Sequence, residues 1–388
     1  MSKLPNIVLT DEQEQCVNSV HAWYKNPMAN QVFFLAGNAG TGKTTLIAFI
    51  LEKLGIKVDD CAFATYTGKA ALVLSKKNNV SCSTVHGLCY ELVEDYLDDH
   101  TNQVVMKWKI KKDSKAAKAK LIILDEVSML NKAMMSDLMY YKCKILALGD
   151  TFQLAPVEGD CFFHANYKPD FELKTIHRQA LENPIIWLSQ QVRYGRDIGN
   201  GKYGDTVQRL SITDMTNEML FDADQVIVGT NATRRQYNKF FRDELGLSKK
   251  GLMPVRGDRL ICLKNQVSDG LVNGMMMVAT RDSTTVEHKE IYRCSFNTED
   301  GGTFFDVKCA GADILGHKST LPYIRQKALT RIDYSYAITC HKSQGSQYGH
   351  VAFVDEGFGR WLDDNTYYRH LYTAITRAAE TLTIISTK

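Results

Sequence analysis

The amino-acid sequence predicts an α/β protein with mainly parallel sheets, divided into two or three compact units. Its length of 388 residues exceeds that of one ordinary domain. Short apolar, β-rich runs recur ahead of polar or glycine-rich turns, and helical segments separate several of them, as is typical of strands buried on both faces. The runs expected to form strands are Val32–Leu35, Cys61–Ala64, Leu121–Leu124, Lys144–Leu148, Gln225–Val228, Val351–Val354 and Leu382–Ile385.

The composition is that of a globular protein with a substantial core. Hydrophobic residues make up 44% of the chain and charged residues 23%, which excludes a largely disordered protein. The formal net charge is only +3, so a surface that binds nucleic acid would have to be a local basic patch. The ten cysteines lack the spacing of a metal site and are expected to be reduced thiols. Residues 1–15 contain no apolar signal core and no apolar run is long enough to span a bilayer, so we expect a cytoplasmic protein.

A glycine-rich run follows the first predicted strand and precedes a helical segment at residues 45–54. It fits the P-loop pattern, in which backbone N–H groups and a helix N-terminus bind phosphate oxygens. Lys43 is expected to reach the β- and γ-phosphates of ATP, and Thr44 to hold Mg²⁺. The alternative is a glycine turn that binds no nucleotide. The residues expected to bind ATP here are Gly37, Asn38, Ala39, Gly40, Thr41, Gly42, Lys43, Thr44 and Thr45.

Two carboxylates end the apolar strand expected at residues 121–124. Asp125 is expected near the metal, with Thr44, and Glu126 near the attacking water as a catalytic base. Solvated acids at a strand end are the alternative. A later strand ends in the segment 149–156, where Gln153 could sense the γ-phosphate as a catalytic residue. An ordinary turn containing Asp and Pro explains that segment equally well.

Two segments interrupt the α/β pattern. Residues 90–120 are first acidic and then rich in lysine around Trp108, which suggests an inserted hairpin. Its lysines could neutralise phosphates and Trp108 could stack on a base, whereas a solvated face with Trp108 in a core is the alternative. Residues 254–324 alternate polar and apolar positions between Asp-Gly, Asn-Gly and Gly-Gly turns, which suggests a small antiparallel barrel.

Taken in order, the motifs of residues 13–377 resemble the superfamily 1B DNA helicases of the RecD and phage Dda type. The resemblance implies two RecA-like P-loop motor domains, residues 1–176 and 177–388. The first would carry a β-hairpin (pin) insertion at about 88–120 and the second a small SH3-like β-barrel insertion at about 254–324.

The implied activity is DNA-stimulated hydrolysis of ATP, with Mg²⁺, that drives 5′ to 3′ movement on single-stranded DNA and unwinding of duplex DNA. The implied partners are single-stranded DNA and forked duplex DNA, and no membrane. The resemblance also implies a functional monomer in a bacterial or phage-infected cytoplasm, with replication, recombination or repair proteins as candidate partners.

The resemblance adds residues to the nucleotide site. Gln13, which ends the segment 9–13, corresponds to the amide that reads adenine. Gly345 belongs to a segment similar to motif V, and Gln347 stands where the family usually has a glutamate on the ribose. Arg178, after motif III, and Arg377, in the motif-VI-like segment 371–378, are implied to face the γ-phosphate as catalytic cations. Surface salt bridges are the alternative for both arginines.

The resemblance also implies a DNA-binding set that spans both domains. It draws on the segment 65–71, similar to motif Ia although Tyr66 replaces the usual proline, and on the segments 83–86, 230–234 and 338–345. Together with the proposed pin, the implied residues are Thr65, Thr67, Lys69, Thr84, His86, Trp108, Asn231, Thr339, His341 and Lys342.

Other functions fit part of the sequence. An RNA or mixed-substrate helicase would use the same backbone-gripping motifs, because contacts to the 2′-hydroxyl cannot be recognised in sequence. A nucleotide-gated ATPase that binds a single strand without unwinding is a second alternative. A P-loop kinase would leave the segments 343–345 and 376–377 unexplained.

Overall fold

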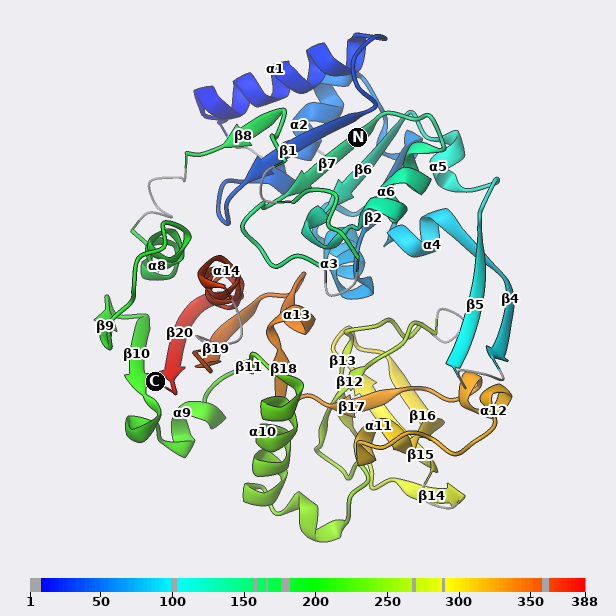
Figure 1. The fold of residues 1–388 in the computed structure, drawn as a ribbon, viewed down its shortest axis with the longest axis vertical. Helices are drawn as coiled ribbons and strands as arrows, with labels where there is room; N and C mark the ends of the chain where they lie inside the picture. Colours follow the sequence, from blue (N-terminus) through cyan, green and yellow to red (C-terminus); the bar gives the residue numbers. More distant parts are fainter. Residues whose placement is uncertain are drawn as a thin grey trace.

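The computed structural model describes residues 8–98, 103–156, 159–164, 167–175, 182–266, 270–287, 290–357 and 363–387 (Figure 1). Within these ranges the chain forms two parallel sheets, a curled antiparallel sheet and a two-stranded hairpin. The α/β class and the mainly parallel pairing expected from the sequence are confirmed. None of the helices in the described ranges is long and apolar enough to cross a membrane.

The first parallel sheet lies at the top of Figure 1 and has six strands in the described residues. In spatial order they are β3 (Cys82–Thr84), β2 (Cys61–Thr65), β6 (Leu121–Asp125), β7 (Ile145–Gly149), β1 (Val32–Gly37) and β8 (Phe171–Leu173). The associated helices are α1 (Asp11–Lys25), α2 (Lys43–Leu54), α3 (Gly68–Asn78), α4 (Val85–Cys89), α5 (Lys115–Lys118) and α6 (Lys132–Met139), with 3-10 turns η1 (Val58–Asp60) and η2 (Val127–Met129).

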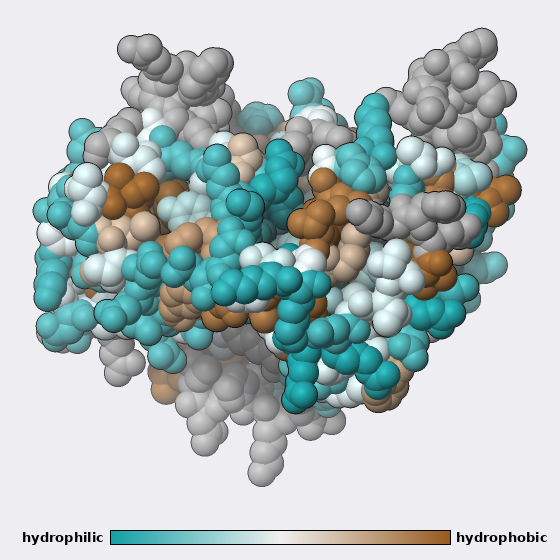
Figure 2. Space-filling model, turned by 90° about the horizontal axis from the view of Figure 1, so that it is seen from below, coloured by the Kyte–Doolittle hydropathy of each residue, from teal (hydrophilic) through white to brown (hydrophobic). Residues whose placement is uncertain are grey.

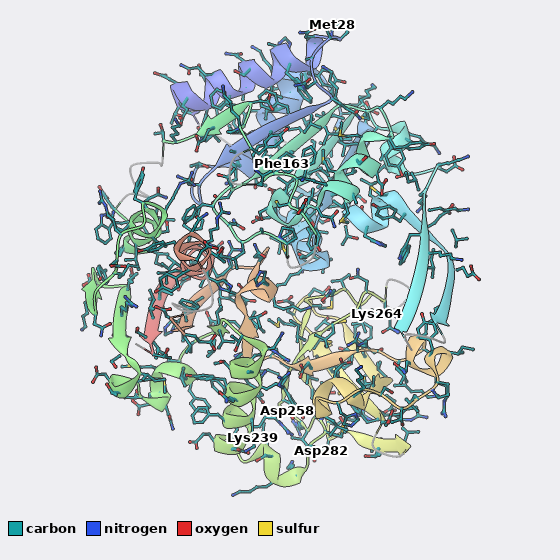
Figure 3. The ribbon with its side chains drawn as sticks, in the orientation of Figure 1. Met28, Phe163, Lys239, Asp258, Lys264 and Asp282 are labelled. Atoms are coloured by element: carbon teal, nitrogen blue, oxygen red, sulfur yellow. The ribbon has the colours of Figure 1, made fainter. Side chains whose placement is uncertain are left out.

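Strand β1 shows why its residues are continuously apolar. Phe33 and Leu35 join a core with residues of α1 and α2, whereas Phe34 on the other face joins a core with residues of α4 and α6. Phe163, labelled in Figure 3, packs against Phe34 with tilted rings whose centroids are 4.4 Å apart. Because both faces are covered, every position of β1 is buried.

The second parallel sheet is built from residues after β8. Its described strands, in spatial order, are β18 (Ala337–Thr339), β11 (Gln225–Val228), β19 (Tyr348–Asp355), β20 (Ala378–Ser386), β10 (Val207–Ser211) and β9 (Gly201–Tyr203). Only the edge pairing of β9 with β10 is antiparallel within this described sheet. The accompanying elements are α8 (Pro184–Arg193), η3 (Ile212–Asp214), α9 (Asn217–Phe221), α10 (Asn231–Glu244), η4 (Leu247–Lys250), α13 (Cys340–Ser343) and α14 (Asp364–Ile375).

The curled antiparallel sheet interrupts the second parallel sheet between η4 and β18. Its strands are β12 (Arg259–Cys262), β13 (Met276–Ala279), β14 (Thr284–Glu287), β15 (Ile291–Thr298), β16 (Thr303–Ala310) and β17 (Ile332–Tyr334), with the short helices α11 (Gly311–Leu315) and α12 (Tyr323–Lys327). The backbone N–H of Ala310 donates to the carbonyl of Thr330 over 3.0 Å. This bond brings the end of β16 back beside the start of β17, so the sheet curls into a half-barrel.

The curled sheet shares one hydrophobic core with the second parallel sheet, including Val228, Phe241 and Phe296. Asp258, labelled in Figure 3, lies where α10 meets the curled sheet and accepts a hydrogen bond from Arg242 over 3.0 Å. The Tyr336 hydroxyl donates to the same carboxylate over 2.9 Å. The curled sheet is therefore fastened to the second parallel sheet.

The hairpin consists of β4 (Tyr90–Asp98) and β5 (Gln103–Ile110). It leaves the first parallel sheet after α4 and runs down one side of the molecule toward α12 (Figure 1). The face seen in Figure 2, from the side of α10, shows small hydrophobic patches separated by hydrophilic residues. The ten cysteines are all free thiols, as expected, and burial raises the pKa of Cys340 to about 12.

Candidate nucleotide site and nucleic-acid interface

The P-loop connects β1 to α2 through two left-handed glycines. Gly40 has φ 80° and Gly42 has φ 81°, a backbone region that L side chains rarely adopt. A Cβ on Gly37 would lie 2.7 Å from the Thr41 hydroxyl, so the loop tolerates only glycine there. Lys43 begins α2, and Thr44 and Thr45 follow half-buried in its first turn. The loop thus has the compact curvature that turns backbone N–H groups toward an anion.

Lys43 and Thr44 contact two different parts of the site, the P-loop and the end of β6. The Lys43 ammonium donates to the carbonyls of Gly37 over 2.5 Å and Asn38 over 3.0 Å. The Thr44 hydroxyl donates to the carboxylate of Asp125, at the end of β6, over 3.0 Å. Two hard oxygen ligands therefore lie side by side, which fits Mg²⁺ held mainly by phosphates and water. In the described part of the chain no three His, Cys, Asp or Glu residues gather to hold a metal without such help.

Glu126 joins the two halves of the molecule electrostatically. Its backbone is left-handed, with φ 54°, and its N–H donates to the Asp125 carboxylate over 2.9 Å. Burial raises the pKa of the Glu126 carboxyl, and the positive charges of Arg377 and Lys43 oppose that rise. A cation from each half therefore acts on this one carboxylate.

Arg377 lies two residues after the end of α14 and is only 5% exposed. Its guanidinium donates to the carbonyl of Thr373 over 3.1 Å, to the carbonyl of Ser346 over 3.2 Å and to the hydroxyl of Thr376 over 3.2 Å. Among the ion pairs of the described residues none involves Arg377. Uncharged carbonyl and hydroxyl acceptors therefore position the guanidinium, whose charge acts on Glu126.

Gln153 is buried next to this site. Its side-chain oxygen has no hydrogen-bond partner among the described residues, and its backbone carbonyl accepts from Arg369 over 3.1 Å. The next N–H, of Leu154, donates to the Thr373 hydroxyl on α14 over 3.1 Å. The segment after β7 is therefore attached to the second half, and a buried amide oxygen remains available.

Sequence reasoning missed two P-loop neighbours from the second half. Arg193, at the end of α8, donates to the Asn38 side chain and forms a 3.4 Å ion pair with Asp150. The Tyr372 hydroxyl, on α14, accepts from the backbone N–H of Ala39 over 3.2 Å and donates to Asp150. Residue 372 lay within the motif-VI-like segment, so a signal existed there, whereas α8 offered none.

Several residues expected at the nucleotide have other neighbours in this structure. The Gln13 amide donates to the carbonyl of Thr41 over 3.2 Å and accepts in the cap of α1, so it braces the P-loop. A Cβ on Gly345 would lie 2.8 Å from Ala70 on α3, which places this glycine against the motif-Ia-like segment. Gln347 is exposed, one residue beyond Ser346, which contacts Arg377. Arg178 lies outside the described residues.

Threonine N-caps lie at the strand-to-helix turns of the expected DNA-binding segments. Thr67 caps α3 and Thr84 caps α4, after the adjacent strands β2 and β3. Thr230 caps α10, which begins with Asn231, and Thr339 caps α13, after the adjacent strands β11 and β18. Because these helices begin at the carboxyl ends of parallel strands, the N-termini of the longer helices α3 and α10 add positive potential to this edge.

Other residues of the expected DNA-binding set already have partners within the protein. The Thr65 hydroxyl is buried and donates to the carbonyl of Thr67 over 2.9 Å. Lys69 forms a 3.2 Å ion pair with Glu299 of the curled sheet. His341 is half-buried, with its ring centroid 5.4 Å from that of His370, and burial lowers its pKa.

An open pocket of about 460 Å³ lies between α10, α13 and the curled sheet. Asn231 and Lys342 line it, together with Arg234, Arg235 and Arg331. The Lys342 ammonium donates to the Asn273 side chain over 2.8 Å. A basic pocket thus continues the edge that carries the threonine caps.

Trp108 lies on the hairpin with 42% of its surface exposed. Its ring meets the His86 ring edge-on, with centroids 4.3 Å apart, so α4 supports the base of the hairpin. In β5, Trp108 pairs with Leu92, which is also exposed. Trp108 is therefore a partly exposed aromatic and is not enclosed in a core.

Comparisons with known proteins agree with this geometry. Residues 8–214, more than half of the chain, match the family model described as an AAA domain, and residues 334–385 match a UvrD-like helicase C-terminal domain. The chain is 27% identical over 384 residues to the ATP-dependent RecD2 DNA helicase of Deinococcus radiodurans, covering 90% of this chain and 46% of that protein. It is 29% identical over 200 residues to the ATP-dependent DNA helicase dda of Enterobacteria phage T4, covering 48% and 43%.

The fold is similar to that of the Bacteroides Pif1 helicase in complex with ADP-AlF3 and single-stranded DNA. The TM-score is 0.57 at 20% identity, over 99% of this chain and 93% of that one. The chain spans less than half of the length of the two curated relatives. It belongs to the AAA-domain family and is similar, over both matched regions, to helicases of the RecD and Dda type.

Proposed function

We propose that this chain is an ATP-driven DNA motor that moves along a single strand and unwinds duplex DNA. The observation that carries the proposal is that the P-loop meets α14 through the 3.2 Å hydrogen bond from Ala39 to Tyr372, where Lys43 and Arg377 both oppose the rise in the pKa of Glu126. Because these two cations come from different sheets, hydrolysis at this site would depend on how the two sheets are positioned relative to each other. Chemistry would then drive relative movement of the two halves.

We divide the chain into two motor domains, residues 1–176 and 177–388. The hairpin at about 88–120 would be the insertion of the first domain. The insertion of the second, expected as an SH3-like barrel at about 254–324, would be the curled half-barrel, whose last strand β17 extends beyond that range. Sheet membership supports this division, because β8 is the last strand of the first parallel sheet and β9 opens the second.

The nucleotide roles follow from the contacts. Glu126 would act as the base that orients and deprotonates the attacking water, because burial raises its pKa and so makes the carboxylate a better proton acceptor. Lys43 and Arg377 would stabilise charge on the transferred phosphoryl group, and the buried amide of Gln153 would report its presence. Arg178, after motif III, would supply a second arginine by resemblance. Gln13 and Gln347 would read the base and sugar.

Thr44 and Asp125 would hold Mg²⁺ through the oxygens that now share a hydrogen bond. The metal would supply positive charge that neutralises the phosphates of ATP. Residues of the chain itself would orient the phosphates and accept the proton. The P-loop N–H groups orient the phosphates, and Glu126 receives the proton.

We propose that single-stranded DNA follows the edge formed by the threonine caps of α3, α4, α10 and α13. Backbone N–H groups at these turns, with Lys69 and Lys342, would bind phosphates without reading sequence. Trp108 on the hairpin would separate the strands of a forked duplex, since an exposed aromatic can stack on any base. The polarity of 5′ to 3′ rests on the resemblance alone.

Strand displacement tests the proposal. Forked duplexes with a 5′ tail, a 3′ tail or no tail are incubated with ATP or with a nonhydrolysable analogue. We expect strand release only with ATP and preferentially from the 5′-tailed duplex. Hydrolysis without strand release from any duplex would favour a single-strand-binding ATPase, and equal stimulation by RNA would favour a mixed-substrate helicase.

A further inference from the structure

We propose that Tyr372 is a positioning residue that couples the P-loop to Arg377. The proposal rests on the proposed ATP hydrolysis and adds to it a physical connection between the two halves. Tyr372 lies in the last turns of α14, five positions before Arg377. Its hydroxyl reaches across the molecule to the P-loop.

The hydroxyl makes one hydrogen bond to each of two elements of the first half. It accepts from the backbone N–H of Ala39 over 3.2 Å and donates to the carboxylate of Asp150, directly after β7. The side chain is fully buried, and its ring meets that of Phe152 edge-on at 5.2 Å. Burial and the adjacent Asp150 carboxylate raise the pKa of Tyr372 well above its usual value, so the hydroxyl stays protonated and keeps both bonds.

The connection continues from Tyr372 to Arg377. The next residue along α14, Thr373, accepts a hydrogen bond from the Arg377 guanidinium through its carbonyl over 3.1 Å. Its hydroxyl accepts from the N–H of Leu154 over 3.1 Å. A displacement of Ala39 within the phosphate loop is therefore passed to Tyr372 by one hydrogen bond, along the chain to Thr373, and by a second hydrogen bond to the cation beside Glu126.

A second brace runs parallel to the first. Arg193 of α8 contacts both Asn38 and Asp150, and Gln190 of the same helix accepts from the Asn38 amide over 3.3 Å. Helix α8 packs on α14. Both braces end on neighbouring P-loop residues, 38 and 39, so a shift of the loop either moves α8 and α14 with it or breaks these hydrogen bonds. Buried polar networks of this kind fix one arrangement because every lost bond leaves an unpaired group.

The test compares two tyrosines of the same helix. Tyr372→Phe removes the hydroxyl and keeps the ring. Tyr367→Phe is the matched control, because the Tyr367 hydroxyl donates to Asp355 over 3.0 Å at the end of β19, away from the P-loop. We expect Tyr372→Phe to lower the kcat of DNA-stimulated hydrolysis about tenfold with the KM for ATP changed less than about twofold, whereas Tyr367→Phe matches the parent.

A double-mutant cycle separates positioning from a general structural role. If Tyr372 acts through Arg377, Tyr372→Phe should lower kcat about tenfold in the parent but hardly at all in the Arg377→Ala background. Independent, multiplying effects of the two substitutions would overturn the proposal, as would a Tyr372→Phe enzyme with the parent kcat. If Tyr372→Phe lowers the thermal midpoint more than Tyr367→Phe does, the cycle is repeated with Asp150→Asn, which weakens the same contact. A parent without DNA-stimulated hydrolysis would overturn the proposed function as well, which distinguishes the two failures.

Discussion

Lys69 of α3 forms a 3.2 Å ion pair with Glu299 of the curled sheet, and its ammonium lies 5.3 Å from the centre of the Tyr348 ring. The lysine is only 9% exposed. This contact joins the two halves on the side of the threonine caps, as the Tyr372 hydroxyl joins them at the P-loop. A DNA phosphate that approaches α3 must therefore compete with Glu299 for Lys69.

Removing that competitor should strengthen DNA binding. We predict that Glu299→Gln lowers the Kd for single-stranded DNA roughly three- to tenfold at low salt, because Lys69 then pairs with phosphate and releases a counterion. Fluorescence anisotropy over a series of salt concentrations measures the effect. Asp282→Asn is the control, since it removes one exposed negative charge that pairs with Lys250. If both variants bind single-stranded DNA equally more tightly, the change in net charge alone explains the effect. Weaker binding by Glu299→Gln would contradict the prediction.

Glu126 should control turnover and its dependence on pH. We predict that Glu126→Gln keeps ATP binding and lowers kcat roughly 10²- to 10⁴-fold, the usual contribution of a general base. In the parent, kcat should fall on acidification at a pH above the 4.5 of an ordinary glutamate, because burial raises the pKa of Glu126 and makes its proton harder to remove. Steady-state kinetics between pH 5 and 9 measure this limb of the profile. A Glu126→Gln enzyme that turns over at the parent rate would remove the residue from its role.

Trp108 should affect unwinding more than hydrolysis. We predict that Trp108→Ala keeps ATPase activity stimulated by single-stranded DNA and slows strand displacement about fivefold, because loss of stacking on a base costs roughly 1 to 3 kcal/mol. Trp187→Ala is a matched control, since Trp187 is exposed to a similar degree, 44% against 42%, on α8. The paired assays are ATPase on a single strand and displacement of a forked duplex. Parent-like values in both assays would exclude Trp108 from strand separation.

His370 should make the stability of the second half sensitive to acid. Burial, and then the charge of His341, lower the pKa of His370 from 6.5 to about 4. A histidine with a depressed folded-state pKa contributes stability above its unfolded pKa, and the contribution is lost as the pH falls from about 6.5 toward 4, by up to roughly 3 kcal/mol. Urea unfolding across this range should show a smaller loss in His370→Gln than in the parent. The exposed His317→Gln serves as the control, and a parent-like slope in His370→Gln would contradict the assignment.

The sequence predicted the strands in which nearly every consecutive residue is buried. Strands β1, β6 and β11 lie in runs with apolar residues on both faces, and all three form where they were expected. The short strands β3 and β18 were not recognised, because each contributes three residues at the edge of a sheet and β3 is mixed in polarity. Their pairing depends on neighbours that lie far away in the chain.

The same distinction applies to the candidate site. The P-loop turn and the position of Asp125 at a strand end could be predicted because each depends on residues that are adjacent in the sequence. The Lys69–Glu299 pair, separated by 230 positions, and the Tyr372 bond to Ala39 could not, because only the packing of the two halves creates them. Arg178 remains a prediction from resemblance, since it lies outside the described residues.

The central claim is that charge at the phosphates is held jointly by Lys43 and Arg377 from opposite halves. The most direct measurement is the ATP hydrolysed and strand displaced by the parent, Lys43→Ala and Arg377→Ala on the 5′-tailed forked duplex. We predict that the parent hydrolyses ATP and releases the strand, and that Lys43→Ala does neither. Arg377→Ala should still bind the duplex, with hydrolysis reduced roughly 10³-fold or more and no strand release, because the cation from the second half is missing. Strand release at the parent rate by Arg377→Ala would contradict the account.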